Sequence, residues 1–202
     1  MPYQRIPTSH VPDPVVRAIL HRADLLLGDV YTMCCKQPLK RTKAGGCQFS
    51  ALLVLLCIID ALASHVYPPT KSMPQKPGIQ GKRFKKLIRD KLHWPAGGIG
   101  IAQAASILWK ECRNPLTHAT GLDEKAHHKY SGLDEPVAGM WGDVKPERMR
   151  NVDQRKTWPD NWPILSLDRA VLREATGKPA RLKLTIVALY WSVKRLVQEF
   201  AK

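Results

Sequence analysis

The segment 48–65 constrains the fold of this chain most, because apolar residues cover most of its circumference when it is drawn as a helix. They recur at intervals of three and four positions, as on an α-helix: Phe49, Leu52, Leu53, Leu56, Ile59, Leu62 and Ala63. A helix that is apolar nearly all round must be covered by other elements, so the sequence predicts the central helix of a bundle. Asp60 interrupts the apolar run at 51–63, which is too short to cross a bilayer.

Helical periodicity elsewhere in the chain predicts further helices at about 14–33, 81–92, 100–118 and 179–201. Asp13 is a suitable N-cap for the first of them, with Pro14 at the first helical position. Apolar residues of the last one alternate spacings of four and three: Leu182, Ile186, Leu189, Val193, Leu196 and Phe200. That stripe is typical of a long helix packed in a bundle or across a dimer interface.

The stretch 120–162 has no regular period and is rich in Gly, Asp, Lys and Trp. It is either an ordered insertion or a mobile flap, and its tryptophans either pin it to the core or stack on unpaired bases. After it, 163–167 has the pattern of a short strand and 168–175 that of a short helix. The sequence therefore predicts one all-α domain over residues 1–202, a bundle of four to five main helices with a long irregular insertion before the C-terminal helix.

The charge balance indicates a polyanionic partner. Lys and Arg together number 32 against 17 Asp and Glu, which gives a formal net charge of +15. Such an excess attracts nucleic acid or an anionic membrane through long-range attraction and counterion release, although a merely soluble basic protein also fits. Because no segment is long and apolar enough to span a bilayer, we expect nucleic acid and no membrane.

Cysteine usage and the N-terminus indicate a cytoplasmic protein. The five cysteines are odd in number, form no Cys-x-x-Cys pair and lie mostly among apolar residues, as reduced packing residues do. The N-terminal residues lack the apolar core of a secretory signal. A zinc site built from Cys34, Cys35, His127 and His128 is the alternative for those side chains.

A short polar cluster follows the apolar part of the helix predicted at 100–118. Arg113, Asn114 and His118 lie within six residues. On a straight helix Asn114 and His118 share a face, whereas Arg113 and His118 are about 140° apart. Pro115 removes a backbone hydrogen bond and clashes with the preceding turn. We therefore expect either that the helix kinks or ends there, which brings His118 toward Arg113, or that a second protomer completes the site across a two-fold axis.

These side chains suit metal-free chemistry on a phosphodiester. His118 can act as general acid or base near neutral pH while a ribose 2′-hydroxyl attacks the adjacent phosphate. Arg113 can present its planar fork to the phosphate oxygens, and Asn114 can orient the phosphate or the imidazole. The scheme requires no metal and no cofactor. The structural alternative is that the same residues only cap the end of a helix.

The cluster also resembles a known motif. Residues 108–118, with Arg113 and His118 at the two key positions, resemble the Arg-x(4–6)-His motif of the HEPN superfamily, including the polar residue favoured after the arginine. The order of the preceding segments is similar too: a long apolar helix ending Ile58-Ile59-Asp60-Ala61-Leu62, then Gly81-Lys82-Arg83-Phe84, then the motif helix. The resemblance covers about 51–121, and beyond it only a final helix corresponds.

Membership of that family implies an all-α bundle, usually a homodimer with the two motifs facing each other. Many members are metal-independent endoribonucleases of toxin–antitoxin, abortive-infection or other antiviral defence systems. On that pattern Arg113 and His118 are catalytic and Asn114 assists. The implied partners are RNA, a second copy of the chain, and an antitoxin or other protein.

Two other functions remain open. Some HEPN domains are non-catalytic modules that bind RNA or protein. Outside the family, the chain could be an all-α DNA-binding regulator with 81–92 as its recognition helix, although a proline-rich loop precedes that helix where a tight turn is expected.

Charged residues outside the motif have candidate supporting roles. Asp60 either supports the site, by accepting hydrogen bonds from the motif arginine or orienting the motif histidine, or it lies at a solvent-facing helix end. Arg83, Lys86 and Arg89 either follow RNA phosphates or form a solvated basic face.

Overall fold

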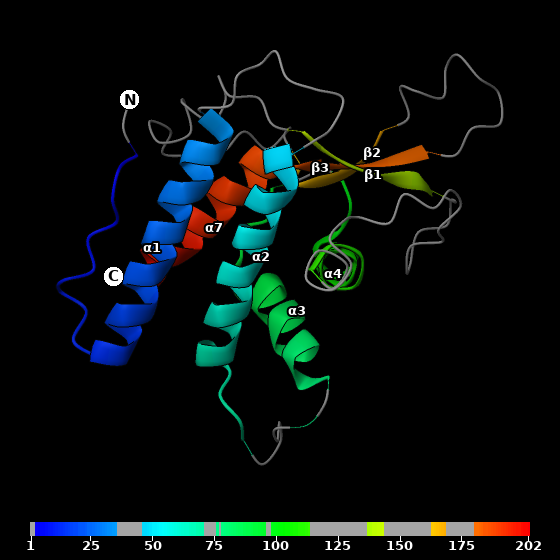
Figure 1. The fold of residues 1–202 in the computed structure, drawn as a ribbon. Helices are drawn as coiled ribbons and strands as arrows, with labels where there is room; N and C mark the ends of the chain where they lie inside the picture. Colours follow the sequence, from blue (N-terminus) through cyan, green and yellow to red (C-terminus); the bar gives the residue numbers. More distant parts are fainter. Residues whose placement is uncertain are drawn as a thin grey trace.

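A computed structural model of the protein describes residues 3–35, 46–70, 76, 78–95, 98–113, 137–143, 163–168 and 180–202. The helices are α1 (Pro14–Cys35), α2 (Gly46–Val66), α3 (Ile79–Lys91), α4 (Ile101–Ile107), the π-helix η1 (Leu108–Arg113) and α7 (Ile186–Phe200). The strands are β1 (Val137–Asp143), β2 (Leu165–Asp168) and β3 (Ala180–Thr185). Most described residues are helical, which confirms the predicted all-α class, and a small sheet lies at one end of the helices (Figure 1).

Helix α1 begins as its sequence predicts. The Asp13 carboxylate oxygen Oδ1 accepts hydrogen bonds from the backbone N–H groups of Val15 at 2.8 Å and Val16 at 3.1 Å. The Asp13 carbonyl accepts the first intrahelical bond, from Arg17 N at 2.9 Å. Asp13 therefore satisfies two of the N–H groups that every helix start leaves without an intrahelical acceptor, and its assignment as N-cap is confirmed.

Helices α2 and α7 together form the centre of the bundle. Helix α7 packs against both α1 and α2 and lies between them in Figure 1, and every residue from 186 to 194 is buried. Helix α2 packs against α1, α3 and α7 and buries Ala51, Leu52, Leu55, Leu56, Ile58, Ile59, Leu62 and Ala63. The predicted central place of this helix is confirmed, although it shares that place with α7. No helix in the described part of the chain combines the length and apolarity needed to cross a bilayer.

The C-terminal helix is shorter than its stripe predicts. It begins at Ile186 instead of Pro179, because residues 180–185 form strand β3 in a sheet of order β1-β3-β2. Leu182 and Leu184 are both buried and Lys183 between them is half-buried, which is the period-two alternation of a strand. The spacing of four from Leu182 to Ile186 fits a helix as well, so the apolar positions alone did not distinguish the two structures.

The other two strands revise the insertion predicted at 120–162. Strand β1 runs parallel to β3 within that stretch, so 137–143 is regular structure, while β2 pairs antiparallel with β3 and confirms the short strand expected at 163–167. Asp168, expected to start a short helix, is the last residue of β2. The rest of that predicted helix lies outside the described residues.

Helix α4 changes its winding before the motif. Its α-helical part ends at Ile107, and the chain continues as the π-helix η1 with Leu108 and Cys112 buried. The kink or helix end expected at Pro115 is a separate feature, and it lies outside the described residues. Single π-helical turns inside longer helices recur at functional sites. Here the described segment ends at Arg113, the first residue of the predicted cluster.

Candidate functional site

The structure describes one of the three predicted catalytic residues. Arg113 is the last residue of η1, and Asp60, its predicted support, lies on α2. Asn114 and His118 lie outside the described residues, as do Pro115 and the predicted bend of the chain there. The geometry available for the candidate site is therefore that of the arginine and the groups around it.

Arg113 forms an ion pair with Asp60 between two neighbouring elements. The guanidinium Nη2 donates to the carboxylate oxygen Oδ2 at 2.8 Å, and the two side chains are 21% and 14% exposed. Of the two alternatives that the sequence left for Asp60, the structure therefore shows the hydrogen bond from the motif arginine and not an open helix end. A charged hydrogen bond shielded from water to this extent is stronger than a fully exposed ion pair and holds the guanidinium in a defined plane.

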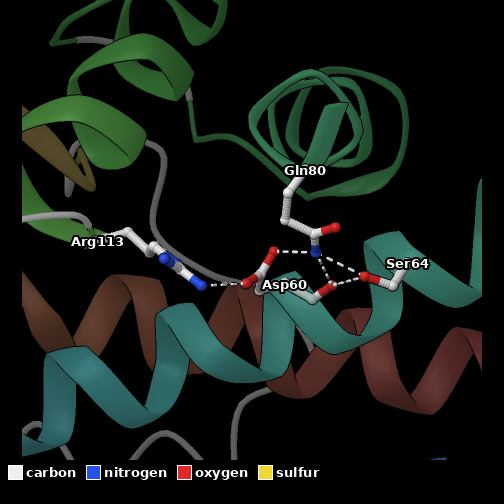
Figure 2. Close-up of polar contacts among 4 residues, drawn as sticks. All are labelled: Asp60, Ser64, Gln80 and Arg113. Carbon is white, nitrogen blue, oxygen red and sulfur yellow. Dashed lines mark hydrogen bonds and ion pairs between the residues drawn. The ribbon is translucent and has the colours of Figure 1, made fainter. Parts of the chain in front are cut away.

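The second carboxylate oxygen of Asp60 binds the start of α3 (Figure 2). Gln80 Nε2 donates to Asp60 Oδ1 at 2.5 Å and to Ser64 Oγ at 2.6 Å. Ser64 Oγ in turn donates to the Asp60 carbonyl at 3.0 Å. The carboxylate is therefore fixed from α3 and from its own helix while it holds Arg113, so the orientation of Arg113 depends on three elements. Nothing in the sequence distinguished Gln80 or Ser64 from ordinary helix residues.

The face of the arginine is covered by an aromatic ring. The Arg113 Cζ atom lies 5.0 Å from the centroid of Trp109, one turn earlier on η1. Trp109 packs in turn against Phe84 of α3, with ring centroids 5.2 Å apart, and lies over Gly81, where an added Cβ would be 2.6 Å from the indole. A planar guanidinium held by a carboxylate at its edge and a ring at its face has little freedom to reorient. Glycine is needed at position 81 because any larger side chain would clash with the Trp109 indole.

Cys57 lies one turn before Asp60 on α2, and its side chain is exposed. Partial burial raises the pKa of the thiol, the Arg113 charge opposes that rise and the Asp60 carboxylate adds to it. The thiol is therefore neutral near pH 7 and is not an activated nucleophile. Cys34 and Cys112 are buried, as predicted for packing residues, and burial also raises the pKa of Cys112.

The three basic residues predicted to follow RNA phosphates lie in different environments on α3. Lys86 and Arg89 are accessible, whereas Arg83 is only 3% exposed, which corrects its predicted place among the surface cations. Arg83 stands four positions before the buried Leu87 and therefore shares its face of the helix. The spacing of Arg83 from Leu87 in the sequence could have shown this.

Lys86 is held by two neighbours. Its Nζ lies 2.6 Å from Asp90 Oδ2 and 4.9 Å from the centroid of the Tyr67 ring. The Tyr67 hydroxyl donates to the same Asp90 oxygen at 2.9 Å. The hydrogen bonds from Lys86 and Tyr67 lower the pKa of Asp90, and burial together with the Asp90 carboxylate raises the pKa of Tyr67 to about 12. Asp90 is therefore ionised and Tyr67 protonated throughout the neutral range.

Among the described residues, no group of three or more His, Cys, Asp or Glu side chains is close enough together to hold a metal ion. Two members of the alternative zinc site, His127 and His128, lie outside those residues. Comparison of the chain with protein-family models, curated proteins and solved structures gives no match.

Proposed function

We propose that this protein is a metal-independent endoribonuclease of the HEPN type that cleaves single-stranded RNA. The observation that carries the proposal is the fixed arginine at the start of the motif. Asp60 and Trp109 hold Arg113 at the last residue of the π-helix η1. An arginine positioned in advance can stabilise charge in a transition state without a cost for ordering it during the reaction.

In the proposed reaction His118 accepts the proton of a ribose 2′-hydroxyl, and the resulting oxygen attacks the adjacent phosphorus. The bond from phosphorus to the 5′-oxygen of the next nucleotide breaks, and that oxygen takes up a proton from an imidazolium. The products are a 2′,3′-cyclic phosphate and a 5′-hydroxyl. Arg113 neutralises the charge that grows on the non-bridging oxygens, Asn114 orients the phosphate or the imidazole, and Asp60 acts as a positioning residue for Arg113.

The proposal extends to assembly and setting. A homodimer would place the motif of one protomer opposite that of the other and bring together residues that a straight helix keeps apart. The formal net charge of +15 favours RNA as the substrate. We further propose a cytoplasmic toxin–antitoxin or antiviral defence system as the setting, with an antitoxin or another protein as the regulator.

The test is cleavage of a single-stranded RNA by purified protein in the presence of EDTA. Wild type, Arg113→Ala and His118→Ala are compared with Arg22→Ala, which removes an exposed cation of α1 far along the chain from the motif. We expect a loss of about a hundred- to ten-thousandfold in rate for the first two variants and no change for the control. Equal rates in all four proteins would show that the motif is not catalytic.

Binding measurements on the same proteins separate the alternative functions. RNA binding that weakens steeply with salt, without cleavage and without an effect of His118→Ala on affinity, would instead identify a non-catalytic binding module. Tighter binding to duplex DNA than to RNA in competition would identify a DNA-binding regulator.

A further inference from the structure

A basic pocket of about 290 Å³ lies between α3 and α4, away from the Asp60–Arg113 pair. Its lining consists of Lys82, Lys85, Lys86, Arg89, Ala102 and Ser106. Four of these six residues are cations, and no carboxylate of the described residues lines the pocket. Of the four, only Lys86 has a carboxylate within salt-bridge distance in the described part of the chain, namely Asp90.

The four cations occupy one face of α3 because their spacing is three, four and seven positions. Like charges three or four positions apart repel one another and destabilise a helix. Lys82 also lies in the first turn, where a positive charge opposes the helix dipole, and that turn contains no acidic residue. These cations depart repeatedly from the charge preferences of a helix, as residues of a functional surface do. A bound anion would remove the repulsion between them.

The opposite wall of the pocket leaves room for a ligand. It is formed by Ala102 and Ser106, two small side chains one turn apart on α4. Among the described residues, the hydrogen bond of Ser106 is a long one, 3.4 Å to the Ala102 carbonyl, so its hydroxyl can turn toward a ligand oxygen. A volume of this size corresponds to about ten water molecules, enough for a phosphate group with an attached sugar.

We propose that this pocket binds a backbone phosphate of the RNA strand, at a nucleotide other than the one being cleaved. The inference deepens the proposed function and rests on it for the identity of the strand. Helix α4 continues directly into η1, so the pocket and Arg113 belong to one helical segment. Ser106 and Arg113 are only seven positions apart along that segment. One phosphate in the pocket would therefore fix the register of the strand against the motif.

The test measures binding of a fluorescently labelled oligouridylate by anisotropy, in a His118→Ala background so that the probe stays intact. The pocket variant Lys82→Gln/Lys85→Gln is compared with Lys91→Gln/Lys202→Gln, which removes the same charge from exposed residues outside the pocket. A third variant, Ala102→Phe, fills the pocket without changing the charge. Thermal melts establish that each variant is folded.

We expect the dissociation constant to rise at least tenfold for the pocket double variant and for Ala102→Phe, and less than threefold for the control. The slope of affinity against salt should fall by about one for each phosphate that the variant no longer neutralises. Equal weakening of the two double variants would show that binding follows overall charge. That result, or wild-type affinity for Ala102→Phe, would overturn the proposal that the pocket binds RNA.

Two competitors identify the ligand chemistry. Inorganic phosphate should displace the probe only at millimolar concentration, and displacement at micromolar concentration would assign the pocket to the free ion and overturn the RNA assignment. Polyglutamate that displaces the probe as well as unlabelled RNA of equal charge would overturn the phosphate assignment.

The outcome is independent of catalysis. A wild-type protein that does not cleave RNA, but whose binding depends on the pocket, would refute the proposed nuclease and support the pocket. Cleavage by wild type together with normal binding by the pocket variants would do the reverse.

Discussion

Two carboxylates, Asp24 and Asp60, interrupt the apolar sides of α1 and α2, and each pairs with an arginine distant in the sequence. Asp24 receives hydrogen bonds from the Tyr3 hydroxyl at 2.6 Å, from Ile6 N at 3.0 Å and from Arg5 Nη1 at 3.1 Å. It is 3% exposed while Arg5 is 58% exposed. At Asp60 the arginine is much more deeply placed than Arg5, since Arg113 is only 21% exposed.

The difference shows two uses of one interaction. Asp24 attaches the N-terminal residues to α1. Arg5 keeps most of its surface in water, so the carboxylate is the fixed partner of this ion pair and holds the N-terminal segment in place. Asp60 is itself fixed by Gln80 and holds a guanidinium that Trp109 also covers. The first arrangement stabilises the fold, and the second positions a cation. Mutation of Asp24 should therefore lower mainly the stability of the protein, and mutation of Asp60 should lower mainly its proposed catalytic rate.

The largest effect on stability should come from Asp24→Ala. The half-buried Tyr3 hydroxyl and the buried Ile6 amide lose the Asp24 carboxylate as acceptor, which costs about 2–3 kcal/mol of unfolding free energy. Urea denaturation followed by circular dichroism measures this loss, with Asp29→Ala, an exposed position on the same helix, as the control. Cleavage per folded molecule should not change. A loss below about 0.5 kcal/mol, or a defect in cleavage alone, would erase the distinction between Asp24 and Asp60.

Asp60→Asn should show the reverse pattern. The amide keeps the shape of the carboxylate but not its charge. We therefore expect kcat to fall about tenfold with little change in KM, because in the proposed reaction Arg113 acts mainly in the transition state. Stability should fall by less than about 1 kcal/mol, since the pair is partly exposed. The sharper measurement is the double variant Asp60→Asn/Arg113→Ala. If Asp60 acts through Arg113, the asparagine should cost nothing further there, and independent losses would contradict a positioning role.

Gly81→Ala should disturb the same site from the other side of the arginine. The added methyl would meet the Trp109 indole at 2.6 Å, and overpacking costs about 1–3 kcal/mol. The helical preference of alanine over glycine returns about 1 kcal/mol, so a net loss of about 1 kcal/mol is expected. Cleavage should fall several-fold as Trp109 shifts under Arg113. Gly100→Ala, where an added Cβ meets nothing within 4 Å, is the matched control.

The sequence was sufficient where periodicity or a single strong partner decides the structure. The apolar circumference of 48–65 and the N-cap at Asp13 could be predicted from local pattern. The hydrogen bond from Arg113 to Asp60 was one of two alternatives, on the ground that a buried carboxylate requires a partner and the motif offers a cation, and the structure decides for it. Arg83 was wrongly predicted among the surface cations, because its charge favours the surface whereas its spacing of four from Leu87 places it on the buried face of α3.

Other features depend on contacts that one segment alone does not reveal. Strand β3 pairs with β1, about forty positions earlier, and its own apolar spacing fits a helix as well, so its structure depends on that distant pairing. Gln80 joins the site only because α3 packs against α2 and brings its first turn beside Asp60. Both belong to tertiary packing, which the local pattern of each segment leaves undetermined.

The smallest effect concerns a third carboxylate, Asp13, which shares neither the burial of Asp24 nor the arginine of Asp60. Hydrogen bonds from the backbone N–H groups of Val16 and Val15 lower its pKa below the ordinary 3.8. A lowered pKa means that the stabilisation is complete above the ordinary value and is lost as the pH falls through the pKa of the folded protein.

Asp13→Ala should therefore lower the thermal midpoint at pH 7, and its difference from wild type should shrink below about pH 4. Asp13→Asn keeps an acceptor that does not titrate, so its midpoint should follow that of the wild type at neutral pH and fall less steeply in acid. Thermal melts of the three proteins between pH 7 and pH 3 make this comparison. A difference between Asp13→Ala and wild type that stays constant down to pH 3 would mean that the cap does not depend on the ionised carboxylate. Asp13 would then differ from Asp24 and Asp60 in the burial of its side chain and not in the role of its charge.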